Sequence, residues 1–121
     1  MSGNLLFNNG SIGIIDFDFC AYCWRIYDLA TFVWLRALGE TDIPTIMQDV
    51  REPLVRGYET VRPLSEAERR LLPHFVLVRH LWLIGASAIP RTSRFGVGWL
   101  LGEKEKFMSI AAQWTKYLNL V

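Results

Sequence analysis

The sequence predicts an α+β fold that is mostly α, with an N-terminal β-hairpin followed by a bundle of four to five helices. Two short apolar runs, residues 5–7 and 12–15, flank the turn sequence Asn8-Asn9-Gly10. This turn tolerates positive φ and sets the two runs at hairpin spacing. After residue 18 the apolar residues recur every three or four positions, which is the period of helices.

The first predicted helix covers residues 26–38. It is apolar on nearly every side, through Leu29, Phe32, Val33, Trp34 and Leu38. Gly39 follows it, at a position where a left-handed residue commonly ends a helix. Because apolar residues surround this helix, we expect it at the centre of the fold.

A second helix is predicted after Asp42, a capping residue that stands two positions before Pro44. Its apolar residues recur on one face from residue 43 to residue 61. Pro53 lies inside this pattern, where the missing N–H and the ring interrupt helical hydrogen bonding. We therefore expect Pro53 to kink or divide the helix.

The second half of the chain is expected to be wholly helical. Ser65 and Glu68 form the sequence of a capping box, which predicts a short helix. Pro73 then fits the first turn of a separate long helix that ends near residue 89. After a loop at residues 91–98, a last helix begins near residue 97 or 99 and continues to residue 120.

Length and composition limit the possible functions. A chain of 121 residues fits a single domain, here residues 1–121, with a hairpin segment at 1–19 and a helical subdomain at 20–121. A net charge of +1 gives no field that would collect nucleic acid or an anionic membrane, so neither partner is expected. No signal peptide is recognisable, which predicts a cytoplasmic protein. The apolar fraction of 51% is slightly high, and favours a surface that another chain covers.

The cysteines and histidines form no convincing site in the sequence. Cys20 and Cys23 make a lone C-A-Y-C, which could serve redox chemistry or half of a zinc site, but no second pair follows. We expect two reduced thiols that pack as small apolar groups. His74 and His80 are six residues apart and so fall on different helix faces, which favours packing over a shared metal. The five Trp residues lie in apolar stripes and are expected in the core.

Polar residues that suit a metal stand at both ends of the predicted hairpin. Asn4 precedes the first apolar run and Asp16 follows the second, so strand pairing would bring them together at the hairpin base. An amide oxygen and a carboxylate are ligands that Mg²⁺ accepts. Taken singly, however, an Asn beside a strand is commonly a turn residue, and an Asp after a strand commonly ends it.

The wider pattern is more specific than these two residues. It reads N-[LIV]-[LIV]-[FW], a turn, [IV]-[IV]-D-F-D and a second D-L-A, and here it occupies residues 4–7, 14–18 and 28–30. This pattern resembles the aminoglycoside phosphotransferase and choline kinase-like family of small-molecule kinases. The likeness continues through Gly57-Tyr58 and residues 79–82 and covers essentially the whole chain, which would make it the C-terminal helical lobe of such a kinase.

The resemblance implies roles for individual residues. In the family, the matching Asn and the first Asp of I-D-F-D hold the Mg²⁺ ions that bridge the phosphates of ATP, which implies metal binding by Asn4 and Asp16. Asp18 would contact the groups around the metal rather than the metal itself. Asp28, the Asp of D-L-A, would brace the catalytic loop, although a carboxylate at a helix start also suits the helix dipole.

Other features depart from the family pattern. The family's catalytic Asp stands five positions before the Asn, whereas only Met1, Ser2 and Gly3 precede Asn4. We therefore expect the catalytic base and the nucleotide-binding lobe to be absent. Cys23 stands where the family usually has Gly, so the resemblance does not fix the backbone conformation just after I-D-F-D.

Two functions follow from these expectations. The first is the C-terminal part of an ATP-dependent phosphotransferase that supplies Mg²⁺ ligands and substrate-binding helices, is inactive alone, and acts on a small-molecule hydroxyl or amine that the sequence does not identify. The second is a non-catalytic helical interaction module, a kinase remnant that acts through self-association. The high apolar content fits both and predicts a homo-oligomer.

Overall fold

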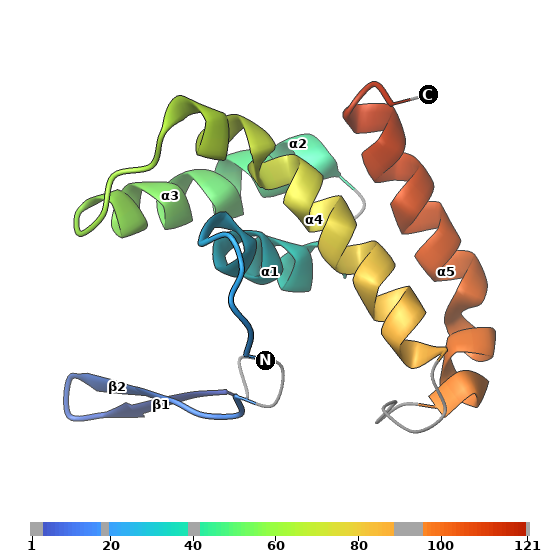
Figure 1. The fold of residues 1–121 in the computed structure, drawn as a ribbon, viewed down its shortest axis with the longest axis horizontal. Helices are drawn as coiled ribbons and strands as arrows, with labels where there is room; N and C mark the ends of the chain where they lie inside the picture. Colours follow the sequence, from blue (N-terminus) through green and yellow to red (C-terminus); the bar gives the residue numbers. More distant parts are fainter. Residues whose placement is uncertain (1–3, 18–19, 39–41, 89–95, 121) are drawn as a thin grey trace.

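The computed structural model describes residues 4–17, 20–38, 42–88 and 96–120, with the backbone alone for residues 96–100. The predicted α+β, mostly helical fold is confirmed (Figure 1). The elements in chain order are β1 (Leu5–Asn8), β2 (Ser11–Ile14), α1 (Ile26–Ala37), α2 (Ile43–Ile46), the π-helical segment η1 (Met47–Arg51), α3 (Glu52–Glu59), α4 (Glu66–Ser87) and α5 (Gly96–Tyr117).

The core lies between α1, α4 and α5, with further buried residues from α2 and α3, and the hairpin extends away from it (Figure 1). Helix α1 packs most extensively on α4, and α4 also packs along α5. Ala30 and Val33 in α1 are fully buried, as are Leu72 and Val76 in α4. The prediction that the first helix is central is therefore confirmed. Among the described helices, none is long and apolar enough to cross a membrane.

Helix α4 corrects the prediction for residues 65–89, because it is one continuous helix and not a short helix followed by a long one. Ser65 caps it as predicted, and both hydrogen bonds of the capping box are present. Pro73, however, lies well inside the helix. Its ring leaves the carbonyl of Arg69 without the usual N–H donor, four residues later in the chain. Arg51 supplies the donor instead, because its Nη2 lies 3.0 Å from the Arg69 carbonyl oxygen.

We expect Arg51→Ala to lower the free energy of unfolding by about 1–3 kcal/mol, because it leaves the Arg69 carbonyl without a donor and removes the Arg51–Glu52 ion pair. In a Pro73→Ala background the loss should be smaller, since alanine at that position has an N–H to donate to this carbonyl. Urea unfolding of the four proteins in this double-mutant cycle measures the difference. Arg56→Ala, at an exposed position in α3, is the control. Equal losses in both backgrounds would contradict the pairing of Arg51 with Pro73.

The second predicted helix is divided near Pro53, as expected, but by a change of helix type. It begins with α2, where Asp42 Oδ2 accepts a 3.0 Å hydrogen bond from the Thr45 N–H. It widens to the π-helical η1 and returns to α-helix at α3, with Pro53 in the first turn of α3. The N–H of Glu52 bonds to the carbonyl of Met47, five residues earlier, just before the proline that cannot donate.

Candidate metal centre

The turn of the hairpin determines the register of the two strands beside the predicted metal ligands. Asn9 and Gly10 form a two-residue loop, and both have positive φ, 45° and 81°. A turn with positive φ at both central residues matches the right-handed twist of the strands, and Asn-Gly is its preferred sequence. The turn fixes the register, in which Leu5 pairs with Ile14 and Phe7 with Ile12.

This register brings Asn4 and Asp16 together at the open end of the hairpin. The N–H of Ile15 donates to the Asn4 carbonyl over 3.1 Å, which extends the ladder past the last strand pair. The Asn4 side-chain Nδ2 then donates to Asp16 Oδ2 over 3.3 Å. Asp16 has a φ of 67°, in the left-handed region that Asp tolerates at a modest cost. The local backbone thus turns the Asp16 carboxylate towards Asn4.

The two side chains offer a partial coordination set for a hard cation. Both are exposed, and their hydrogen bond engages the Asn4 amide nitrogen, which leaves Asn4 Oδ1 and Asp16 Oδ1 open. Mg²⁺ is commonly held by one or two protein oxygens, with waters and substrate phosphates completing its shell. In the described ranges, the hairpin included, no group of three or more His, Cys, Asp or Glu side chains is placed to hold a metal. The donor set at the hairpin base fits Mg²⁺ shared with a phosphate.

The roles predicted for Asp18 and Asp28 are not tested by the structure. Asp18 lies outside the described residues. Asp28 is exposed in the first turn of α1, where its charge suits the helix dipole, and its role in bracing a catalytic loop stays a prediction.

The prediction that the thiols pack as small apolar groups is wrong, because Cys20 and Cys23 are both free and exposed. They lie in residues 20–25, an irregular stretch before α1 in which no residue is buried. A periodicity argument does not apply to this segment, since it has neither helical nor strand geometry.

The Trp residues are divided between core and surface. Trp34 and Trp114 are buried as predicted, at 6% and 1% exposure. Trp24 is 71% exposed and Trp82 is 37% exposed, so the core prediction is wrong for these two. Trp99 lies outside the residues whose side chains are described.

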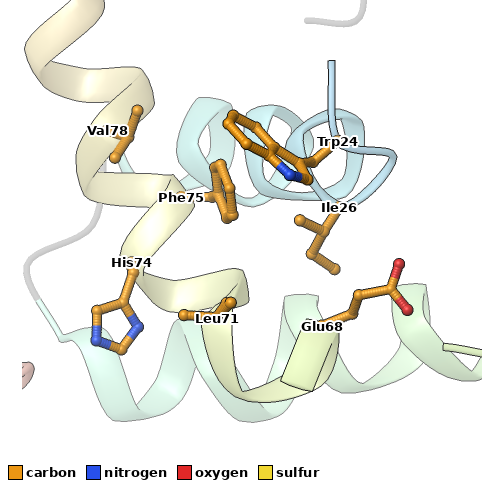
Figure 2. Close-up of a pocket in the computed structure, with 7 residues that line it drawn as sticks. All are labelled: Trp24, Ile26, Glu68, Leu71, His74, Phe75 and Val78. Atoms are coloured by element: carbon orange, nitrogen blue, oxygen red, sulfur yellow. The ribbon is translucent and has the colours of Figure 1, made fainter. Parts of the chain in front are cut away.

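A pocket of about 380 Å³ lies between the segment before α1 and the first half of α4 (Figure 2). Its wall is almost entirely apolar, and the Trp24 and Phe75 ring centroids are 5.6 Å apart. Glu68 and His74 stand on opposite sides of it (Figure 2). The Glu68 carboxylate is already engaged by Arg25 and Ser65. The pocket therefore offers a ligand apolar contacts, and its carboxylate, that of Glu68, is already paired. It is lined by Trp24, Ile26, Glu68, Leu71, His74, Phe75 and Val78.

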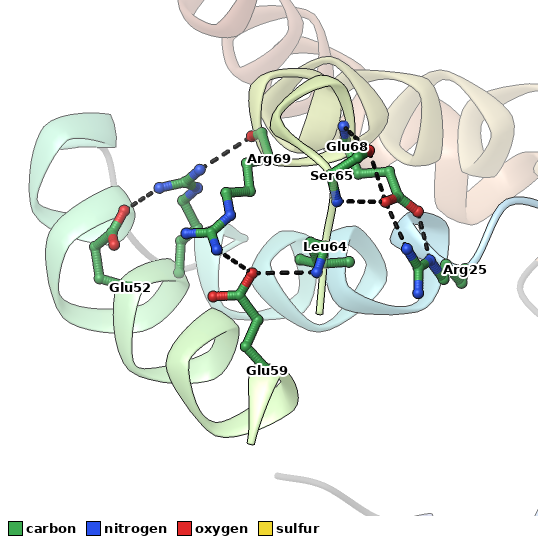
Figure 3. Close-up of polar contacts among 8 residues, drawn as sticks. Arg25, Glu52, Glu59, Leu64, Ser65, Glu68 and Arg69 are labelled. Carbon is green, nitrogen blue, oxygen red and sulfur yellow. Dashed lines mark hydrogen bonds and ion pairs between the residues drawn. The ribbon is translucent and has the colours of Figure 1, made fainter. Parts of the chain in front are cut away.

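An ion pair ties the start of α1 to the start of α4 (Figure 3). Arg25 donates from Nε and Nη2 to the two carboxylate oxygens of Glu68, at 2.5 and 2.6 Å. Ser65 donates its backbone N–H and its hydroxyl to the same carboxylate, each at 2.8 Å. The Arg25 guanidinium, followed by the Ser65 donors, lowers the pKa of Glu68 to about 2. The ion pair thus fixes the start of α1 to the start of α4. No local pattern in the sequence points to Arg25, because its partner Glu68 is 43 residues away.

Comparison with known proteins supports a phosphotransferase. Residues 1–64 match the model of the phosphotransferase enzyme family. A homoserine kinase of Gluconobacter oxydans is 41% identical over 71 residues, which are 58% of this chain and 22% of that protein. A homoserine kinase of Phenylobacterium zucineum is 43% identical over 74 residues, 58% of this chain and 21% of that protein. An uncharacterized protein of Deinococcus radiodurans is 34% identical over 85 residues, 70% of this chain and 24% of that protein. No solved structure matches the chain significantly.

A hairpin with an amide and a carboxylate at its base, followed by a helical subdomain, is what the resemblance to small-molecule kinases implied, and two of the three relatives named above are called homoserine kinases. The chain belongs to the phosphotransferase enzyme family. The matched segments span less than a quarter of the length of these relatives.

Proposed function

We propose that this chain forms part of an ATP-dependent small-molecule kinase, in which Asn4 and Asp16 hold a Mg²⁺ ion that bridges the phosphates of ATP. The observation that carries the proposal is the meeting of the two side chains at the hairpin base, 3.3 Å apart. Bound Mg²⁺ neutralises charge on the phosphates and orients them for transfer. The chain's own contribution is positional, since the Asn9-Gly10 turn fixes the register that places both ligands.

The acceptor we propose is a hydroxyl of a small molecule, in the cytoplasm where ATP and Mg²⁺ are both present. Three relatives named homoserine kinases support homoserine as the first compound to test. Because the matched segments span under a quarter of those proteins, we expect this chain to supply metal ligands and helices and not the whole reaction. An amine acceptor is the alternative that the resemblance leaves open.

We expect Asp16→Asn to weaken Mn²⁺ binding, in the presence of ATP, by about 10-fold or more. Even groups that only support a metal's ligands commonly contribute that much, so loss of a carboxylate ligand should cost no less. Mn²⁺ is the probe because it replaces Mg²⁺ and broadens NMR signals of nearby nuclei. In the unaltered chain, the backbone amides of Asn4 and Asp16 should broaden first.

Asp49→Asn is the matched control, because Asp49 is an exposed carboxylate in η1, outside the hairpin. It should leave Mn²⁺ binding unchanged. If Asp16→Asn and Asp49→Asn bind Mn²⁺ alike, or if the broadening begins elsewhere in the chain, the metal assignment is wrong.

A second candidate function, a self-associating interaction module, is favoured by the exposed apolar residues of the hairpin. Phe7 and Ile12, a directly opposed pair, are 70% and 62% exposed. We infer that a second copy of the chain covers them. The two functions are compatible.

A further inference from the structure

Arg79 is held between two tryptophans on the side of α4 that faces α1. Its guanidinium carbon lies 4.4 Å from the centroid of the Trp82 ring and 5.2 Å from that of Trp34. Arg79 and Trp82 are three residues apart and so share one face of α4, and Trp34 comes from α1. Trp34 is itself fixed, because its indole N–H donates to His80 over 3.2 Å. The guanidinium therefore rests on a prearranged aromatic support.

Stacking uses the faces of a guanidinium and leaves its N–H groups, which lie in its plane, for other partners. Within residues 4–17, 20–38, 42–88 and 96–120, no carboxylate or carbonyl accepts a hydrogen bond from Arg79. Its Nε is buried without a hydrogen-bond partner, whereas its terminal nitrogens are not among the buried, unpaired atoms of the described residues. An arginine that is partly withdrawn from water and lacks an acceptor is poorly compensated.

The other half-buried arginines among the described residues, Arg25 and Arg51, have acceptors. Arg25 binds Glu68 through two hydrogen bonds, and Arg51 binds Glu52 and the Arg69 carbonyl. Arg36, which also lies over an aromatic ring at 5.6 Å from the Phe32 centroid, is exposed, so water satisfies it. Arg79 thus differs from each of them. It combines partial burial, aromatic support and unpaired terminal donors.

We propose that Arg79, supported by Trp34 and Trp82, binds the carboxylate or phosphate group of a small anionic molecule. The terminal nitrogens form a fork that matches two oxygens of either group, and charged hydrogen bonds of this kind are among the stronger ones in proteins. The indoles restrict the side chain before binding, so less rotamer freedom is lost when the anion arrives. Trp82, which is partly exposed, gives the anion an apolar neighbour. The site does not depend on metal binding at the hairpin.

The test is a titration of the ¹⁵N-labelled chain with inorganic phosphate and, separately, with acetate, at constant ionic strength set with sodium chloride. The signal to follow is the indole N–H of Trp82, assigned by its loss in Trp82→Phe. We expect a saturable shift with at least one of the two anions, with a dissociation constant on the order of 1 mM. Saturation by phosphate alone identifies a phosphate site, and saturation by acetate alone identifies a carboxylate site. No saturable shift with either anion overturns the proposal.

Two variants and a control make the assignment specific. Arg79→Gln should weaken binding at least about 10-fold, because charge and fork are both lost. Arg79→Lys keeps the charge but loses the fork, and should weaken binding about 3-fold or more. Arg36→Gln is the matched control and should bind as the unaltered chain does. If Arg79→Gln does not fold, Arg79→Lys decides. Unchanged affinity in the folded Arg79 variants would overturn the proposal.

Discussion

Acidification from about pH 8 to about pH 5 is expected to destabilise this chain through His80, and His80→Gln is expected to remove that dependence. His80 is fully buried where α1, α4 and α5 meet. Its Nδ1 accepts the indole N–H of Trp34 at 3.2 Å, and its Nε2 lies 2.8 Å from the carbonyl oxygen of Phe107. Because the indole only donates and the carbonyl only accepts, the ring is neutral with its proton on Nε2.

A second proton on His80 would have to go to Nδ1, where it would face the Trp34 N–H. Burial lowers the pKa of His80 below the ordinary 6.5, although the Phe107 carbonyl opposes that shift. The unfolded chain binds a proton near pH 6.5, whereas the folded chain resists it to lower pH. Unfolding therefore takes up a proton between the two pKa values. The stabilisation is fully present above about pH 6.5 and is lost as the pH falls below it, by at most about 1.4 kcal/mol per pH unit.

Urea unfolding at a series of pH values measures this effect. His80→Gln keeps an acceptor for Trp34 and a donor for Phe107 without a titrating group, so its stability should be flatter with pH. His80→Leu keeps neither, and should be less stable than His80→Gln by about 1–3 kcal/mol at every pH, because the Trp34 N–H stays buried without an acceptor. The pH stays above the ordinary pKa of Glu68, 4.5, because the stabilisation by the Arg25 ion pair is lost mainly below that pH.

His74→Gln is the control, since His74 also belongs to α4 but lines the pocket on the side of the segment before α1. It should keep the pH dependence of the unaltered chain. A steep loss of stability towards acid in His80→Gln would show that another group carries the effect.

The features that the sequence predicted correctly depend on neighbouring residues. The hairpin follows from Asn9-Gly10, whose backbone preference is local, and the same turn sets the register that joins Asn4 to Asp16. The Ser65 cap follows likewise from Ser65 and Glu68, three residues apart. In each case, a residue's conformation or hydrogen-bond partner is decided within a few positions along the chain.

The features that the sequence analysis missed depend on distant residues. Pro73 lies inside α4, and the carbonyl of Arg69 that its ring deprives of a donor is bonded by Arg51, 18 residues earlier in the chain than Arg69. The exposure of Trp24 depends on the path of an irregular segment that periodicity does not describe. The aromatic support of Arg79 exists only where α1 and α4 pack together. A single sequence gives no signal for such pairings, because residue spacing on one helix says nothing about which residues of another helix it meets.

The largest effect that we expect is on self-association, through one face of the hairpin. Strand alternation places Leu5, Phe7, Ile12 and Ile14 on the same face, in two directly opposed pairs. The other face carries the pairs Leu6 with Gly13 and Asn8 with Ser11. Phe7, Ile12 and Ile14 are each at least 59% exposed. A lone two-stranded hairpin is marginal in water, so an apolar face of this kind gains from a partner.

A second copy is the partner we propose, because the same face on each chain is complementary to itself across a two-fold axis. Within the hairpin, residues 4–17 carry a single charged side chain, Asp16, so two copies meet with little repulsion. Burying a large apolar side chain contributes roughly 1.5–3 kcal/mol, and each copy brings several. We therefore expect a dimer, or a larger assembly through the free strand edges, at micromolar concentration.

Replacing Phe7 and Ile12 together by Ser should dissociate this assembly while the Asn9-Gly10 turn still forms the hairpin. The double variant removes four large side chains from a dimer, worth about 6 kcal/mol or more if fully buried. Even one third of that weakens association about 30-fold. Light scattering over a range of micromolar concentrations gives the mass of each protein. Val61→Ser, at an 89% exposed position outside the hairpin, should leave the mass unchanged. A monomer in the unaltered chain, with a melting temperature independent of concentration, would mean that the hairpin tolerates its exposed face and that a second copy is not what covers it.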